Sequence, residues 1–298
     1  MFNRRTFLHT AAIATALPHM ALQAAPAGTS PLQWTHFPAD ESGFSRAPVL
    51  LSGAQEAMLI DGGFTLSDGR AVAAAIAATG KKLTAIYISQ SDPDYYFGLA
   101  PITAAFPDAK VLAAPETVAA IAANVDKKLA VWSKQLQSNG PQQRKDVVFA
   151  QPMTEPALQL EGHRIEIVPA QGMDNRRYLW VPSLGAIVGG VLVFSGLHVW
   201  TADTPTARAR QAWRDNLDAM LARQPQAVVP GHMVQGSALD ASTIRFTRDY
   251  LVVFEDALAK SKGSAELVAR MLDRYPHLSG QTSLELGAKV VMGEMAWG

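Results

Sequence analysis

Short β-branched runs alternate with helical stretches along this chain, and this alternation restricts the possible folds more than any other feature of the sequence. Residues 83–88 form an apolar run typical of a buried strand, and they lead directly into the polar segment 89–94. The second half repeats the pattern, because the run 226–229 ends in Pro230-Gly231-His232. Two halves of this kind predict an α/β fold in which helices pack outside stacked sheets.

The same periodicity predicts the individual elements. It indicates a β-hairpin over 48–63 and strands at 83–88, 110–113, 164–168, 178–181 and 186–188, the last continued by 191–194. Helices are predicted over 70–79, 99–105, 115–137, after Thr204-Pro205, over 243–260 with Ser242 as cap, over 264–274 with Ser264 as cap, and from Ser283.

Composition and charge narrow the class of protein. Lysine and arginine together number 26, as do aspartate and glutamate, so no general field attracts nucleic acid or an anionic membrane. The chain has no cysteine, which excludes disulfides, iron–sulfur clusters and a thiol nucleophile. With 48% hydrophobic residues, the 298-residue chain can bury a large core. We therefore expect one domain over 28–298 that acts on a small molecule and binds no nucleic acid.

The first 27 residues have the pattern of an export signal. Arg4-Arg5 is followed by Phe7-Leu8, a short apolar run and small residues up to Ala27. The paired arginines favour the twin-arginine type, with an ordinary Sec signal as the alternative. No later stretch reaches about 18 uninterrupted apolar residues, so no membrane insertion is expected after cleavage. These features predict an exported, soluble periplasmic protein.

Four motifs in order carry a family resemblance. They are Leu-Ile-Asp-Gly-Gly at 59–63, the segment 88–95 with Gly98-Leu99 behind it, Val-Gly-Gly at 188–190, and the segment 228–232 that ends in Pro-Gly-His. Together they resemble the metallo-β-lactamase superfamily over most of 28–298. The resemblance implies an αββα sandwich, here with an extra C-terminal helical extension at 242–298. It also implies hydrolase chemistry with metal ions at one edge of the sandwich.

The ligand positions of that superfamily are largely changed in this chain. Its loop reads His-x-His-x-Asp-His, and the corresponding residues here are Gln90, Asp92, Asp94 and Tyr95. Met173 replaces a later histidine, with Asp174 next to it as a substitute, Gly190 replaces a bridging aspartate, and His232 is retained. The resemblance therefore implies the metal ligands Asp92, Asp94 and His232, with Gln90 or Asp174 nearby.

This ligand set is rich in oxygen. It suits a single manganese, iron, calcium or magnesium ion better than zinc, which prefers imidazole and thiolate. If no metal binds, Asp92 and Asp94 form a carboxylate pair in which like charges raise one pKa and make it available for acid–base work.

Three further residues have two interpretations each. Tyr95 either donates a hydrogen bond to a substrate oxyanion or simply fills the space of a metal. His198 either assists the oxyanion or leaving group near the same mouth or is a structural histidine. Asp61 is expected to accept backbone hydrogen bonds that order the 89–94 loop, and not to contact substrate. Under the catalytic interpretation, Asp94, Tyr95 and His198 carry the reaction.

Two functions follow from these residues. The first is a periplasmic hydrolase with at most one metal ion, whose bound water attacks a small ester, lactone, amide or thioester. The second is a catalytically inactive relative without a metal, which serves as a binding or scaffold protein. The second interpretation depends on the positions that no longer hold strong ligands: Gln90, Tyr95, Met173 and Gly190.

Overall fold

The computed structural model describes residues 30–297 of the chain. The predicted export signal, residues 1–27, lies outside this described part. Within it, no helix combines the length and the apolar character needed to cross a membrane.

The first sheet has six strands in chain order, β1-β2-β3-β4-β5-β6. Its first three strands are antiparallel, whereas β3 to β6 run parallel to one another. The carboxyl ends of β3 and β4 therefore meet at one edge, which brings Asp61 to the 89–94 loop. The strands are β1 (Gln33–His36), β2 (Val49–Ser52), β3 (Glu56–Ile60), β4 (Lys82–Ile88), β5 (Lys110–Ala113) and β6 (Gln151–Pro152).

The second sheet has the order β12-β10-β9-β8-β7, and a separate pair joins β11 to β13. The prediction that residues 191–194 continue the preceding strand was wrong. Gly189 and Gly190 take positive φ values and turn the chain away, so that Phe194 pairs with His232 instead. The strands are β7 (Ala157–Leu160), β8 (His163–Pro169), β9 (Arg177–Val181), β10 (Ala186–Val188), β11 (Phe194–Ser195), β12 (Ala227–Val228) and β13 (His232–Met233).

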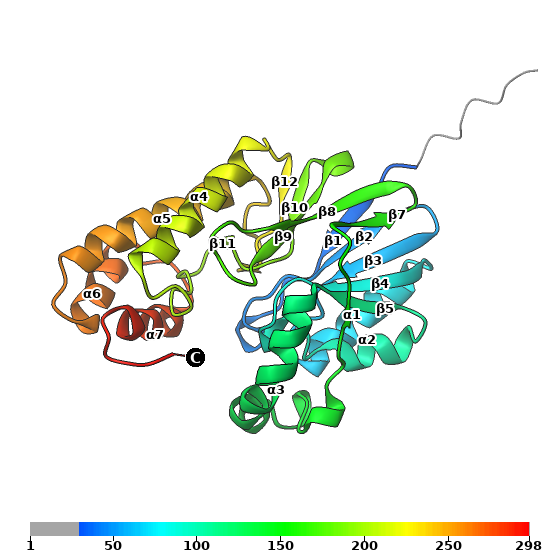
Figure 1. The fold of residues 1–298 in the computed structure, drawn as a ribbon, viewed down its shortest axis with the longest axis horizontal. Coiled ribbons are helices and arrows are strands. Elements are labelled where there is room, and N and C mark those ends of the chain that lie inside the picture. Colours follow the sequence, from blue (N-terminus) through cyan, green and yellow to red (C-terminus); the bar gives the residue numbers. More distant parts are fainter. Residues whose placement is uncertain (1–29, 298) are drawn as a thin grey trace, which may run out of the picture.

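Helices cover the outer face of each sheet (Figure 1). The first sheet packs against α1 (Leu66–Ala78), α2 (Leu99–Ala105) and α3 (Pro115–Leu136). The second packs against α4 (Ala207–Ala222) and α5 (Ala241–Ala259), while α6 (Ser264–Arg274) packs against α5, and α7 (Gln281–Val291) packs against α6. Short 3₁₀ turns occur at Glu41–Gly43, Pro93–Tyr95, Gln137–Asn139, Arg144–Asp146 and Pro182–Leu184.

A third apolar cluster lies between the two sheets and completes the sandwich. Met58 and Tyr87 from the first sheet pack in one buried group with Ile165 and Leu179 from the second. Each sheet is therefore buried on both faces, by helices outside and by the other sheet inside. The predicted αββα sandwich with extra C-terminal helices is confirmed.

Capping residues explain why several helices begin at other residues than expected. The first helix starts at Leu66 and not at residue 70, because Thr65 and Asp68 form a reciprocal capping box. The fourth is capped by Thr206 instead of Thr204-Pro205. The fifth helix is capped by Asp240 and not by Ser242: the side chain of Asp240 accepts a hydrogen bond from the backbone N–H of Ser242. The last helix begins at Gln281, two residues before the predicted start at Ser283.

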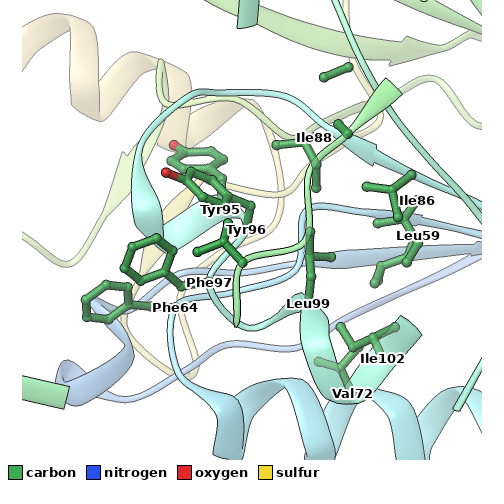
Figure 2. Packing of buried hydrophobic residues seen from close by; sticks show 14 of the residues in the cluster. Leu59, Phe64, Val72, Ile86, Ile88, Tyr95, Tyr96, Phe97, Leu99 and Ile102 are labelled. Atoms are coloured by element: carbon green, nitrogen blue, oxygen red, sulfur yellow. The ribbon is translucent and has the colours of Figure 1, made fainter. Parts of the chain in front are cut away.

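The 89–98 loop is anchored by its own aromatic residues. Tyr95, Tyr96 and Phe97 are buried in the core between the first sheet and its helices. Figure 2 shows the two tyrosine rings next to each other, with their hydroxyl groups pointing away from Ile102. These buried rings anchor the loop to the core, and its polar residues therefore lie at the carboxyl edge of the sheet.

Gly190 permits a close approach of two backbones at this edge. A Cβ atom added there would lie 2.0 Å from the carbonyl oxygen of Arg177, and the residue has a φ of +75°. Gly236 has a similar φ of +82° but open space around it. We expect Gly236→Ala to lower the free energy of unfolding by about 1 kcal/mol, which is the strain of the left-handed conformation alone. Gly190→Ala should lower it by at least about 2 kcal/mol more, because the backbone of residue 177 or 190 must move to make room for the Cβ atom.

Urea unfolding of the two glycine variants, followed by tryptophan fluorescence, measures this difference in the free energy of unfolding. Equal losses in both variants would show that backbone crowding at Gly190 is unimportant.

Candidate functional site

Asp94 and His232 meet at the carboxyl edge of the strands. Asp94 lies in the 3₁₀ turn that follows β4, and His232 opens β13, which is placed here by a β-bridge to Arg46. The Asp94 Oδ2 and His232 Nε2 atoms are 3.5 Å apart, and their side chains are only 11% and 13% exposed. The structure thus brings together two of the site residues predicted from the sequence, although they are far apart in the chain.

A buried arginine, Arg46, occupies the centre of the site. Its Nη2 atom is 2.8 Å from Asp61 Oδ2, and its Nε atom is 3.6 Å from Asp94 Oδ2. Its Nη1 atom donates to the carbonyl oxygen of Gly231, and its Cζ lies 3.7 Å from the centre of the Tyr95 ring. The side chain is 0% exposed. This guanidinium therefore places a fixed positive charge among the residues predicted to bind a metal.

Arg46 is not among the site residues predicted from the sequence. It stands in an irregular segment before β2, and no recognisable motif surrounds it. One available signal was its place just ahead of the apolar run Val49-Leu50-Leu51, since an arginine that becomes buried requires a carboxylate partner.

Asp61 connects the arginine to the polar loop. Its Oδ1 atom accepts hydrogen bonds from the backbone N–H of Ser89, at 2.8 Å, and from the Ser89 hydroxyl, at 2.9 Å. That hydroxyl oxygen in turn accepts the N–H of Gly190. Asp61 is fully buried, so the expectation that it orders the loop by accepting a backbone hydrogen bond is confirmed.

Asp92 lies at the outer side of the site and is paired with two cations. Its oxygens are 3.3 Å from Lys128 Nζ on α3 and 3.7 Å from Arg176 Nη1. Arg176 also contacts Asp203 at 2.9 Å. The charge of Asp92 is therefore already balanced by protein side chains.

The other two predicted ligands differ in their surroundings. Gln90 is buried, and its Oε1 atom accepts the N–H of Ser91, while its Nε2 atom has no protein partner in the described part of the chain. Asp174 is exposed on the turn before β9 and has no ion pair within residues 30–297. The structure therefore keeps Gln90 beside the site but does not bring Asp174 into contact with Asp94 or His232.

The two predicted catalytic partners are also separated. The Tyr95 ring lies under Arg46 and faces the edge of the His232 ring, with the ring centres 6.3 Å apart. Its buried hydroxyl has no partner among the described residues. His198 instead contacts Tyr250 of α5, with 3.0 Å between His198 Nδ1 and the phenol oxygen. Tyr95 is thus part of the site, and His198 is part of the C-terminal helical layer.

The environment shifts the pKa values of Asp94 and His232 in opposite directions. Burial raises the pKa of Asp94 to about 7, and Arg46 only partly offsets it. Burial also lowers the pKa of His232 to about 3, and repulsion from Arg46 adds to this. The Nδ1 atom of His232 is 2.8 Å from the carbonyl oxygen of Phe44, which can only accept a hydrogen bond. The imidazole is therefore neutral, with its proton on Nδ1 and a free electron pair on Nε2.

Two tryptophans lie near Arg176, at the outer side of the site. The Nε1 atom of Trp297 donates to Asp203 Oδ1 at 2.8 Å, and the rings of Trp297 and Trp200 meet edge to face. The cavity bordered by Trp200, Asp203 and Arg176 has a volume of about 10 Å³, and neither Asp94 nor His232 lines it. Such a space holds about one water molecule.

Comparisons with known proteins identify the fold. A metallo-β-lactamase family protein from Thermus thermophilus is similar in structure, with a TM-score of 0.57 and 17% identity over 88% of this chain and 91% of that chain. The metallo-β-lactamase from Pontibacter korlensis gives a TM-score of 0.49 and 17% identity over 70% and 87%. No protein-family model matches the sequence, and no curated protein matches it either. The first likeness shows that the chain has the metallo-β-lactamase fold.

This fold implies metal ions at the edge where Asp94 and His232 lie, but the side chains present do not fit them. Among residues 30–297, no three His, Asp or Glu side chains form a group that could hold a metal ion. Asp94 and His232 supply two ligand atoms, and the Arg46 guanidinium lies against the same Asp94 oxygen. Asp92 is engaged by two cations. The predicted single-ion centre is therefore not formed by these residues.

The shifted pKa values predict how stability depends on pH. Between about pH 4 and 6.5, folded Asp94 keeps a proton that the unfolded chain has lost, whereas unfolded His232 binds a proton that the folded chain excludes. The two contributions cancel in the wild type. In Asp94→Asn only His232 remains, so stability rises with pH over this range. In His232→Gln only Asp94 remains, so stability falls as pH rises towards 7.

Each variant should differ from the wild type by a slope of about 1.4 kcal/mol per pH unit, with opposite signs. Urea unfolding at pH 4.5, 5.5 and 6.5 measures these slopes, and all other groups titrate alike in the three proteins. Parallel curves would show that neither pKa is shifted.

Proposed function

We propose that this chain is a metal-independent hydrolase that uses Asp94 as its acid–base group on a small ester, lactone, amide or thioester. The observation that carries the proposal is the environment of Asp94. Its carboxyl group is buried between a fixed cation and a neutral imidazole, and its pKa of about 7 is near that of an effective general base. The metallo-β-lactamase fold, with its edge site, supports the same class of chemistry.

The reaction requires one proton to be moved twice. The Asp94 carboxylate accepts a proton from a water molecule as the water oxygen attacks the substrate carbonyl carbon. The protonated Asp94 then returns this proton to the leaving group as the carbon–heteroatom bond breaks. The free electron pair of His232 Nε2 accepts a hydrogen bond from the other O–H of the attacking water, which keeps that hydrogen and is oriented by it.

Two further residues support the charged states of this cycle. Arg46 stabilises the Asp94 carboxylate by its charge, without contacting substrate, because it is fully buried. The hydroxyl of Tyr95 has no partner among the described residues but is nearly as buried as Arg46, so it donates to the oxyanion on the carbonyl oxygen only once the surrounding segments move. In this scheme the predicted oxyanion role is kept for Tyr95, and His198 has a structural role against Tyr250.

A second candidate function is a binding protein without turnover. It is favoured by one specific observation, the burial of the site: the side chains of Asp94 and His232 are only 11% and 13% exposed, and Tyr95 is buried. Such a site admits a substrate only if the segments around it move. Without that movement, the sandwich presents its surface to a ligand and performs no hydrolysis.

Hydrolysis assays distinguish the two functions. The purified protein is tested on a panel of small esters, lactones, amides and thioesters, with and without EDTA. We expect turnover that EDTA does not change, and a loss of at least about 100-fold in kcat/KM in Asp94→Asn. Asp108→Asn is the matched control, because Asp108 is exposed and lies just before β5, at the end of the parallel strands opposite to the carboxyl edge. Its activity should equal that of the wild type.

The pH profile gives an independent check. Because the general base must be deprotonated, kcat/KM should rise with pH and level off above about pH 7, the pKa of Asp94. Loss of activity in EDTA would reject the metal-independent mechanism. Absence of turnover on the whole panel would favour the binding protein.

A further inference from the structure

We infer that Arg46 is a built-in cation that takes the electrostatic place of a metal ion in this fold, and that it keeps divalent ions out of the site. This inference is independent of the proposed hydrolysis, since it concerns only the charges that hold the site together. The guanidinium lies among the oxygens of Asp61, Asp94 and Gly231, as a bound cation would.

The surroundings of Arg46 are built for a positive charge. Two carboxylates and one carbonyl oxygen face its nitrogen atoms, and the face of the Tyr95 ring covers it at 3.7 Å. A buried charge is tolerated when it is paired and hydrogen-bonded, and the two Nη atoms meet that condition through Gly231 and Asp61, while Nε has, among the described residues, only the ion-pair contact with Asp94.

Gly231 makes this arrangement possible. A Cβ atom on Gly231 would lie 3.0 Å from Arg46 Nη1 and 2.1 Å from the carbonyl oxygen of Gly190. Its absence lets the guanidinium reach the backbone directly before His232. The Pro-Gly-His segment, predicted to supply a metal ligand, therefore also supplies a carbonyl oxygen to the arginine.

The same guanidinium opposes binding of a second cation. An ion held by Asp94 Oδ2 and His232 Nε2 would lie close to Arg46 Nε, which is 3.6 Å from that Asp94 oxygen. Like charges at such a distance in a buried site repel strongly. Arg46 also donates a hydrogen bond to Asp61, so the Asp61 carboxylate is not free to coordinate a metal ion.

Truncation of Arg46 should reverse this situation. In Arg46→Ala, Asp61 and Asp94 lose their counter-charge, and the neutral His232 keeps its free Nε2 electron pair. Two carboxylates and one imidazole then line the volume left by the guanidinium; they form no ligand group in their present positions, so they must move towards one another to hold Mn²⁺ or Zn²⁺. In Arg46→Lys a cation remains, so no ion should be recruited.

A melting experiment in EDTA, in Mn²⁺ and in Zn²⁺ tests the inference. The Tm of the wild type should not change between the three conditions, and neither should the Tm of Arg46→Lys. Arg46→Ala should melt lower in EDTA and recover by roughly 5 °C when the metal exceeds its Kd about a hundredfold. Arg210→Ala is the matched control, because Arg210 is equally buried and paired with Glu255 in the C-terminal layer. It should melt lower without any response to metal.

Equilibrium dialysis of the wild type against Zn²⁺ and Mn²⁺ provides a readout that does not depend on the variants folding. Less than about 0.1 equivalent of retained metal is expected, on the level of unspecific binding. One retained equivalent would overturn the inference, as would an Arg46→Ala protein whose melting ignores metal. If Arg46→Ala does not fold in EDTA, recovery of folded protein with Zn²⁺ supports the inference, and failure in both conditions overturns it.

Discussion

The buried ion pair between Arg46 and Asp61 is the interaction on which the rest of the site depends. It joins the segment before β2 to the end of β3, and the Asp61 carboxylate then holds Ser89 and, through it, Gly190. Four chain segments from both sheets are thereby connected by one network of hydrogen bonds. Because both charges are fully buried, loss of either would leave an uncompensated charge in the interior, which is strongly destabilising.

This network also determines the chemistry available at the edge. A fixed guanidinium beside a partly buried carboxyl group and a neutral imidazole is an arrangement for proton transfer, and it leaves no position for a second cation. Between about pH 4 and 6.5, Asp94 keeps its proton and His232 stays neutral, the reverse of the states expected in water. The metallo-β-lactamase fold is retained while the electrostatic centre of the site is supplied by the protein itself.

Much of the fold could be predicted from the sequence because periodicity and turn residues are local signals. The strands at 83–88 and 186–188 and the helix at 99–105 were predicted close to their observed bounds. Strand pairing was less accessible: Phe194 pairs with His232 because two glycines turn the chain, a choice that depends on long-range contacts. At the site, the motif order located Asp94 and His232, whereas an arginine ahead of an apolar run was too weak a local signal to indicate Arg46.

The sequence by itself determined the class of fold and the types of side chain at its edge, because apolar periodicity and motif spacing are properties of the chain. Only the tertiary structure decided which charges meet. Asp92 and Asp94 are neighbours in the sequence, yet one pairs with Lys128 and Arg176 at the surface, while the other faces Arg46 and His232 inside. The energy of a charge depends on its burial and on partners that fold against it from distant segments, and neither can be read from adjacent residues.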